Sequence, residues 1–124
     1  MTAAPPKTNH FPALRKRIVQ ERLFDRRPLQ SIVQLILTVS LFISGMAALL
    51  FTQNIWFVIA DAVFLALING QFAFLLHDAG HRQIFKSTRL NNIIGYITGC
   101  MLGASLQGWM EKHNLHHDHP NHED

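Results

Sequence analysis

The chain has 124 residues, a formal net charge of +3 and 48% apolar residues, a length that suits one small domain. No charged residue occurs from Pro28 to Ala60. Such a stretch is rare in soluble domains, because their surface loops need solvation. The eleven Lys and Arg residues lie outside the long apolar stretches and form no basic stripe interleaved with aromatics. This distribution argues against a nucleic-acid partner and favours contact with membrane lipids.

Residues 1–28 form a basic N-terminal segment that we expect to be cytoplasmic. Between Ala13 and Phe24 the apolar residues Leu14, Ile18 and Phe24 recur on one face of a helix. This pattern fits an interfacial helix on anionic headgroups, and it equally fits a solvated leader. His10 is expected to lie on the surface.

Two long apolar stretches follow, and each is long enough to cross a bilayer. The first covers residues 29–51 and the second residues 55–76, with a polar turn of Thr52, Gln53 and Asn54 between them. The first stretch is too long for a signal peptide and shows no clear cleavage site, which favours a retained anchor. Basic residues precede the first span and follow the second, whereas the turn has none. The positive-inside rule therefore places both ends of this hairpin in the cytoplasm.

The polar residues inside the second span have structural and functional interpretations. Asp61 lies near the outer end of the span, far from the histidines, and is expected near the headgroups or paired within the bundle. Asn69 and Gln71 would line a pocket beneath a metal site or form a helix–helix hydrogen bond, and we favour the hydrogen bond. Cys100 is expected to be a small core or lipid-facing residue.

Two histidine clusters carry the chemistry of the sequence. His77 and His81 stand four residues apart, and His113, His116 and His117 follow at i, i+3 and i+4, so each set shares one helix face. The first cluster superficially resembles the H-E-x-x-H zinc protease pattern, but its acid is an aspartate, one methylene shorter. Imidazole suits iron, zinc, copper and nickel, and five histidines exceed what one tetrahedral zinc takes. Two metals fit better.

The apolar run 93–110 separates the two clusters and decides whether they can meet. If it crossed the bilayer, the clusters would lie about 30 Å apart on opposite sides. We therefore predict a non-spanning, interfacial or re-entrant helix that carries the second cluster. Gly95, Gly99 and Gly103 punctuate the run and would allow close packing against a neighbouring helix. The expected fold is an all-α integral membrane protein with a two-helix spanning hairpin, in which residues 29–124 form the membrane domain.

The segments HDAGHRQIF and GWMEKHNLHHDHPNHED, about 30 residues apart, resemble the membrane fatty acid desaturase family over essentially everything from residue 29 onward. The resemblance implies a di-iron centre that uses O2 to desaturate an acyl chain. It also implies five iron ligands: His77, His81, His113, His116 and His117. Residues that would orient the ligand rings are Asp78, Glu111 and Asp118, and His119 and His122 are weaker candidates for extra ligands.

The sequence departs from the family pattern in two respects. The third histidine box of the family lies farther downstream than Asp124, so five nitrogens would leave two irons undersaturated. We therefore expect the front part of a longer enzyme, or a piece that needs a partner chain, with no activity alone. With 28 residues before the first span we expect no cytochrome b5-like domain there, so a separate ferredoxin or cytochrome b5 type carrier would supply electrons. The substrate would be an acyl-lipid or an acyl-CoA.

Other functions remain compatible with the same histidine pattern. Related membrane hydroxylases and monooxygenases use similar boxes, although the KHNLHHDHPN context favours desaturation. A non-catalytic membrane metal-binding fragment and a gene remnant without function are further alternatives.

Overall fold

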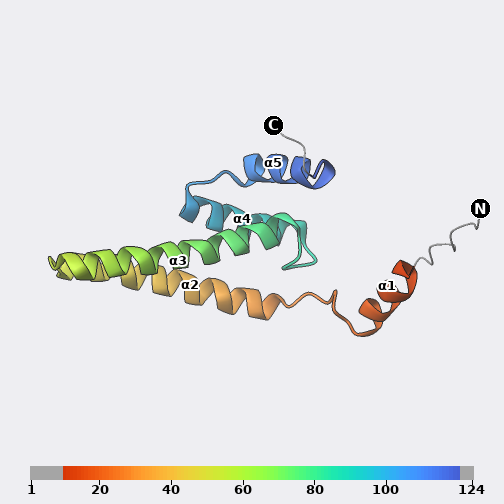
Figure 1. Ribbon diagram of the computed structural model, residues 1–124, viewed down its shortest axis with the longest axis horizontal. Helices are drawn as coiled ribbons and strands as arrows, with labels where there is room; N and C mark the ends of the chain where they lie inside the picture. The colour runs from red at the N-terminus through yellow and green to blue at the C-terminus, as the bar shows by residue number, and fades with distance from the viewer. Residues whose placement is uncertain (1–9, 121–124) are drawn as a thin grey trace, which may run out of the picture.

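The computed structural model describes residues 10–120, and this part of the chain is entirely helical (Figure 1). The helices are α1 (Phe11–Gln20), α2 (Pro28–Ala48), a 3-10 turn (Leu49–Phe51), α3 (Ile55–Gly80), α4 (Thr88–Leu102) and α5 (Leu106–Asp118). The predicted all-α architecture with two long apolar helices is confirmed.

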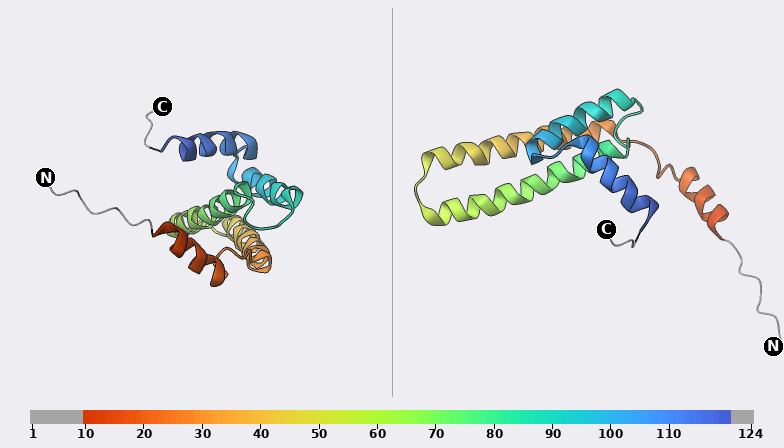
Figure 2. Two further views of the ribbon diagram at one scale, coloured as in Figure 1. Left: turned by 90° about the vertical axis from the view of Figure 1, so that its right-hand side faces the viewer. Right: turned by 90° about the horizontal axis from the view of Figure 1, so that it is seen from above.

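Helices α2 and α3 form the predicted antiparallel hairpin, which dominates the length of the molecule (Figures 1 and 2). The segments 28–51 and 55–80 have 24 and 26 residues, and both are long and apolar enough to cross a membrane. Most of their large apolar side chains are exposed, unlike those of a soluble core helix. Helix α3 continues past the predicted boundary at residue 76, so the first histidine cluster is part of the helix end.

The polar turn between the two spans is built by its own side chains. Asn54 caps α3, because its Oδ1 accepts hydrogen bonds from the backbone N–H groups of Trp56 (2.9 Å) and Phe57 (3.4 Å). Thr52 Oγ1 in turn accepts from the backbone N–H of Asn54 at 3.2 Å. These bonds satisfy helix-end donors that no intrahelical carbonyl reaches, which fixes the start of α3.

The interface of the hairpin contains both apolar and polar contacts. Phe42 and Phe72 meet edge to face with ring centroids 5.8 Å apart. Gln34 Nε2 donates to Gln71 Oε1 at 3.5 Å, a long form of the helix–helix hydrogen bond predicted for Gln71. Asp61 is buried, and its Oδ2 has no hydrogen-bond partner among residues 10–120. The expected pairing of Asp61 is therefore not seen in the described part of the chain.

The apolar run 93–110 is divided between two helices. Gly103 adopts φ +67°, a left-handed conformation that favours glycine, and it ends α4. Ser105 then caps α5 by accepting from the N–H of Gly108 at 3.3 Å. Helix α4 packs along α3, and α5 turns back toward the end of α3 (Figures 1 and 2). The glycine spacing serves this reversal, because a Cβ at Gly95 would lie 2.8 Å from side-chain atoms of Leu106.

The connection between α3 and α4 is held by a buried asparagine that the sequence pattern did not single out. Asn91 is fully buried, and its Nδ2 donates to the carbonyls of Phe85 and Ser87, each at 2.8 Å. Its Oδ1 accepts from the N–H of Phe85 at 3.1 Å. This one side chain therefore fixes the loop that follows the first histidine cluster.

Helix α1 is shorter than the helical pattern predicted over residues 13–24. It ends at Gln20 because Arg22 adopts φ +57° and reverses the chain, with the N–H of Leu23 bonded to the carbonyl of Ile18 at 3.1 Å. Nearly all of its side chains are exposed, and it lies away from the hairpin (Figure 1). Its interfacial position remains a prediction.

Candidate metal centre

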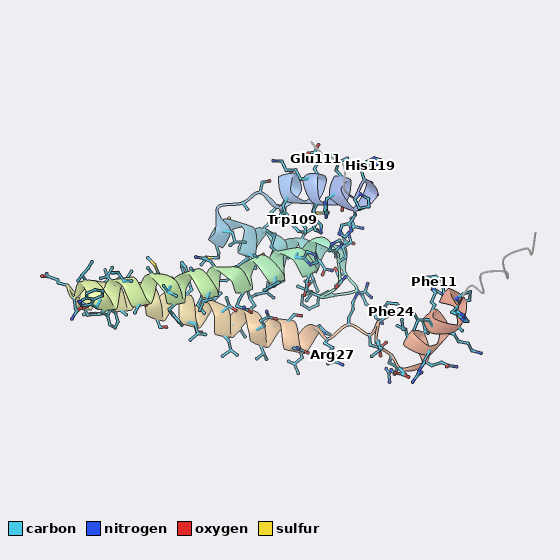
Figure 3. All side chains as sticks on the ribbon, in the orientation of Figure 1. Phe11, Phe24, Arg27, Trp109, Glu111 and His119 are labelled. Atoms are coloured by element: carbon cyan, nitrogen blue, oxygen red, sulfur yellow. The ribbon has the colours of Figure 1, made fainter. Side chains whose placement is uncertain are left out.

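The fold brings the two histidine clusters to the same end of the hairpin. His77 lies in the last turn of α3 and His81 is the C-cap residue of that helix. The other cluster lies on α5, which runs back over the end of α3. Figure 3 labels Trp109 and His119, which precede and follow this cluster along the chain. The convergence depends on the chain reversal at Gly103, because a continuous helix would have carried the second cluster away.

Ring nitrogens of the two clusters lie within coordination distance of a common point. His81 Nε2 is 2.9 Å from His113 Nε2, and His113 Nε2 is 3.0 Å from His117 Nε2. Ligand nitrogens of His77, His81 and His113 all lie within 4.8 Å of one another. Two nitrogens that bind one ion at about 2.1 Å and at right angles are about 3.0 Å apart. In the metal-free centre the same separation permits an N–H···N hydrogen bond, with one ring as donor.

His116 stands apart from the other four histidines. It is exposed, and its ring centroid is 6.4 Å from that of His113 and 6.0 Å from that of His117. His113 and His117, by contrast, are both within ring contact of His81. The structure thus gathers four of the five predicted ligands and leaves His116 at the edge of the group.

The electrostatic environment favours the neutral form of two of these imidazoles. Burial lowers the pKa of His81, and the neighbouring His77 and His117 lower it further, against an opposing effect of Asp78. Burial likewise lowers the pKa of His113, with the other histidines of the group acting in the same direction. A neutral imidazole is the form that binds a metal, so the lowered pKa values of His81 and His113 favour metal binding.

Of the three acidic residues predicted to orient the ligand rings, only Asp78 contacts a histidine. Its Oδ1 is 3.2 Å from His77 Nδ1, an arrangement that leaves Nε2 of His77 for a metal. Glu111 and Asp118 are exposed and form no ion pair or side-chain hydrogen bond within residues 10–120. Asp78 therefore fits the predicted role, whereas nothing in the geometry of the other two supports it.

Trp109 is a member of the site that sequence reasoning missed. Its indole stacks on His113 with ring centroids 4.3 Å apart and an interplanar angle of 18°, and it presents edges to His77 and His81. A Cβ atom at Gly80 would overlap Trp109 Cζ3, so only glycine leaves room for the indole against α3. The spacing of four residues between Trp109 and His113 was the available signal.

The remaining histidines lie elsewhere. His119 is the C-cap residue of α5, and His10 is the N-cap residue of α1. His122 lies outside the described residues. The nitrogen group is therefore built from α3 and α5 alone within the part of the chain that the structure describes.

Imidazoles from two helices converge at one end of an apolar hairpin that is long enough to span a membrane, and they form a candidate metal centre. The comparisons with known proteins identify the family of the chain. The family model for fatty acid desaturases matches residues 54–124, and this chain belongs to that family. The imidazole donors present here fit the iron that such proteins generally use.

Several characterised desaturases are similar to the chain over most of its length. An acyl-lipid (9-3)-desaturase of Physcomitrium patens is 36% identical over 118 residues, which cover 94% of this chain and 22% of the relative. A Delta(5) fatty acid desaturase of Caenorhabditis elegans is 31% identical and a Delta(8)-fatty-acid desaturase of Euglena gracilis 32% identical, over 86% and 90% of the chain. The chain spans 22 to 26% of the length of these relatives. No solved structure matches it.

Proposed function

We propose that these residues form the N-terminal part of an oxygen-dependent fatty acid desaturase with a di-iron centre. The ligands would be His77, His81, His113, His116 and His117. The observation that carries the proposal is the 2.9 Å separation of His81 Nε2 and His113 Nε2. The two residues are 32 positions apart in the sequence and belong to different helices. Such an approach of two imidazoles is what a shared metal requires.

Iron and dioxygen would supply the oxidising power needed to remove hydrogen from an unactivated acyl C–H bond. The residues of this chain would hold the ligand rings in place for that reaction. Asp78 holds the His77 ring, the indole of Trp109 holds His113, and partial burial lowers the pKa of His81, which favours its neutral form. Together they give the ligand nitrogens one orientation before a metal binds, which lowers the entropic cost of binding.

The same proposal includes a substrate, an electron donor and an orientation in the membrane. An acyl-lipid or acyl-CoA would present its chain to the centre at the membrane boundary, and a separate ferredoxin or cytochrome b5 type carrier would deliver electrons. The relatives differ in the double-bond position that their names give, so no position is assigned here. The basic residues at both ends of the hairpin favour a cytoplasmic location for the termini and the histidines.

Five nitrogens do not saturate two irons, so further ligands would come from outside these 124 residues. We therefore expect the 124-residue polypeptide alone not to desaturate fatty acids. A non-catalytic metal-binding function has one observation in its favour: the gathered imidazoles of His77, His81 and His113 would supply three of the ligands of a single tetrahedral ion. A related hydroxylase or monooxygenase would use the same centre.

A chimeric enzyme tests the proposal. This chain would replace the matching segment of the Physcomitrium desaturase, with the chimera expressed in yeast and new unsaturated fatty acids measured by gas chromatography. We expect desaturated product that is lost when His77 or His113 is replaced by alanine and retained when His10 is replaced. Product formation that survives loss of His113 would contradict the proposed ligand set, and an oxygenated product would identify the hydroxylase alternative.

A further inference from the structure

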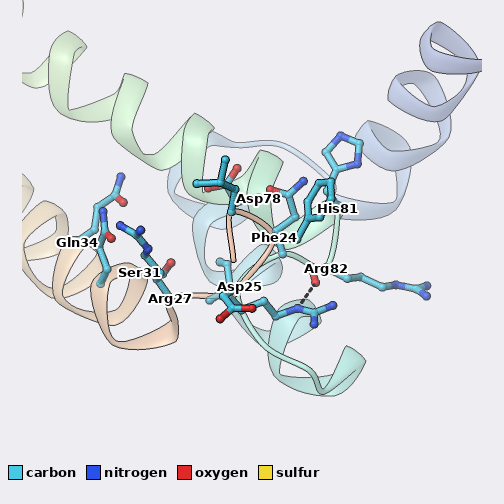
Figure 4. Close-up of a pocket in the computed structure, with 13 residues that line it drawn as sticks. Phe24, Asp25, Arg27, Ser31, Gln34, Asp78, His81 and Arg82 are labelled. Carbon is cyan, nitrogen blue, oxygen red and sulfur yellow. Dashed lines mark hydrogen bonds between the residues drawn. The ribbon is translucent and has the colours of Figure 1, made fainter. Parts of the chain in front are cut away.

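A polar cavity of about 510 Å³ lies beside the candidate metal centre (Figure 4). One wall is the segment that joins α1 to α2 together with the first turns of α2, and the other is the end of α3 with the loop that follows it. His81 and Asp78 line the cavity, so it borders the histidine group directly. Leu23, Phe24 and Ile84 give the lining an apolar part.

The segment before α2 is tied to the loop after α3. Arg26 Nε donates a hydrogen bond to the carbonyl oxygen of Arg82 at 3.3 Å, although the two residues are 56 positions apart. The side chain of Arg82 extends away from the cavity in Figure 4. Arg82 therefore contributes its backbone to this contact, whereas Arg26 and the adjacent Arg27 bring positive charge to the cavity wall.

The positive charge of these two arginines is not neutralised within the described chain. Neither Arg26 nor Arg27 forms an ion pair among residues 10–120. Two acids line the cavity, and each already has a partner: Asp25 pairs with Arg22 at 2.7 Å, and Asp78 contacts His77 at 3.2 Å. The cavity thus offers two guanidinium groups to an anion.

We propose that this cavity binds the phosphate ester of the acyl-bearing substrate, with Arg26 and Arg27 as the anion-binding residues; the assignment rests on the proposed function. Guanidinium groups bind phosphate oxygens through paired charge-assisted hydrogen bonds. The amides of Gln30 and Gln34 and the hydroxyl of Ser31 line the same cavity and add neutral donors. Arginines that only fix membrane orientation would need no such concave, polar surroundings.

The position of the cavity suits a molecule with a charged head and an apolar chain. It lies at the end of the hairpin, where lipid headgroups meet a spanning helix. A phosphate held there would anchor the acyl chain beside His81. The phosphate ester would belong either to a phospholipid or to a nucleotide-type carrier such as coenzyme A, which share this chemistry.

Calorimetric titration of the 124-residue chain in a non-ionic detergent tests the proposal. The probes are dihexanoyl phosphatidic acid, the uncharged dihexanoylglycerol, and coenzyme A. We expect at least one phosphate-bearing probe to bind tenfold or more tightly than dihexanoylglycerol. Binding by phosphatidic acid alone identifies a lipid headgroup, and binding by coenzyme A alone identifies a soluble carrier. Equal affinity for phosphate-bearing and uncharged probes would overturn the proposal.

Variants assign the effect to the two arginines. The double variant Arg26→Gln/Arg27→Gln should weaken binding of the preferred phosphate probe at least tenfold. The single variant Arg27→Gln removes no side-chain hydrogen bond of the described structure, and it should weaken that binding at least threefold. Arg89→Gln is the matched control, because it removes one positive charge from a residue at the start of α4 that does not line the cavity. A loss in Arg89→Gln equal to that in Arg27→Gln would show a general charge effect and refute the assignment.

Cobalt binding separates this proposal from the proposed function. The arginine variants should bind Co²⁺ at the histidine group as the unmodified chain does, which also shows that they fold. A chain that binds no Co²⁺ but discriminates phosphate would refute the metal centre and leave the phosphate site standing. A chain that binds Co²⁺ but does not discriminate phosphate would refute the phosphate site and leave the metal centre standing.

Discussion

Replacing Gly80 with alanine would disturb the contact that seats α5 on α3. The new Cβ would overlap Trp109 Cζ3 and lie 3.2 and 3.3 Å from Cε3 and Cη2 of the same ring. Carbon atoms pack best at about 3.5–4.0 Å, so the indole must move by on the order of 1 Å. His113 stacks on that indole, and its Nε2 is 2.9 Å from that of His81. The displacement therefore reaches the ligand nitrogens.

The size of the effect follows from the cost of overpacking. Inserting a methyl group into a filled contact costs about 1–3 kcal/mol, which corresponds to about a 5- to 150-fold change in an equilibrium constant. If this cost falls on the metal-bound arrangement, Gly80→Ala should weaken Co²⁺ binding by that factor. Titration of the detergent-solubilised chain, followed by the visible absorbance of bound Co²⁺, measures it.

Gly70→Ala provides the matched control on the same helix. A Cβ at Gly70 would have no atom of another part of the structure within 4 Å, so this variant makes the same substitution in α3 without the collision. It should bind Co²⁺ as the unmodified chain does. The Gly80→Ala penalty should also shrink in a Trp109→Phe background, where the colliding ring atoms are absent. Affinities of Gly80→Ala and Gly70→Ala that agree within twofold would refute the proposed seating of α5.

Three further predictions concern the histidine group itself. His116→Ala should weaken Co²⁺ binding less than tenfold and His113→Ala by more than a hundredfold, because only His113 lies among the gathered nitrogens; comparable losses in parallel titrations would contradict this geometry. Asp78→Asn keeps the shape of the side chain but removes its charge beside His77, and should weaken Co²⁺ binding about tenfold. Glu111→Gln is its control, and a similar loss there would argue against ring orientation by Asp78. Because the pKa values of His81 and His113 lie below the ordinary 6.5, the unfolded chain binds more protons than the folded chain as the pH falls below 6.5. Thermal unfolding of the metal-free protein, followed by circular dichroism, should therefore occur at progressively lower temperature from pH 7 to pH 5. An unchanged midpoint over that range would contradict the lowered pKa values of these half-buried rings.

Features that depend on local pattern were predictable from the sequence. The two spans follow from uninterrupted apolar length, and the turn at Thr52–Asn54 from a cluster of capping residues. The shared face of His113 and His117 follows from helical periodicity, which their 3.0 Å nitrogen separation bears out. Each of these features is decided by residues within a few positions of one another.

Features that depend on tertiary packing were not predictable. Four glycines punctuate the apolar run 93–110, and nothing local shows that Gly103 is the one that adopts positive φ. The fit of Trp109 against Gly80 joins residues on different helices, so neither residue alone signals the contact. Arg22 ends α1 in a left-handed conformation that arginine seldom adopts, which explains why the helical pattern extended too far.

Metal content of variants that lack one histidine cluster tests the central claim, that α3 and α5 hold a shared metal centre. Two variants of the 124-residue chain, His77→Ala/His81→Ala and His113→Ala/His117→Ala, would be loaded anaerobically with Fe²⁺ alongside the unmodified chain. Bound iron would then be counted by mass spectrometry. A shared centre predicts that either double variant loses essentially all bound iron. If each variant keeps about half of the iron of the unmodified chain, the clusters bind independently and the account is wrong.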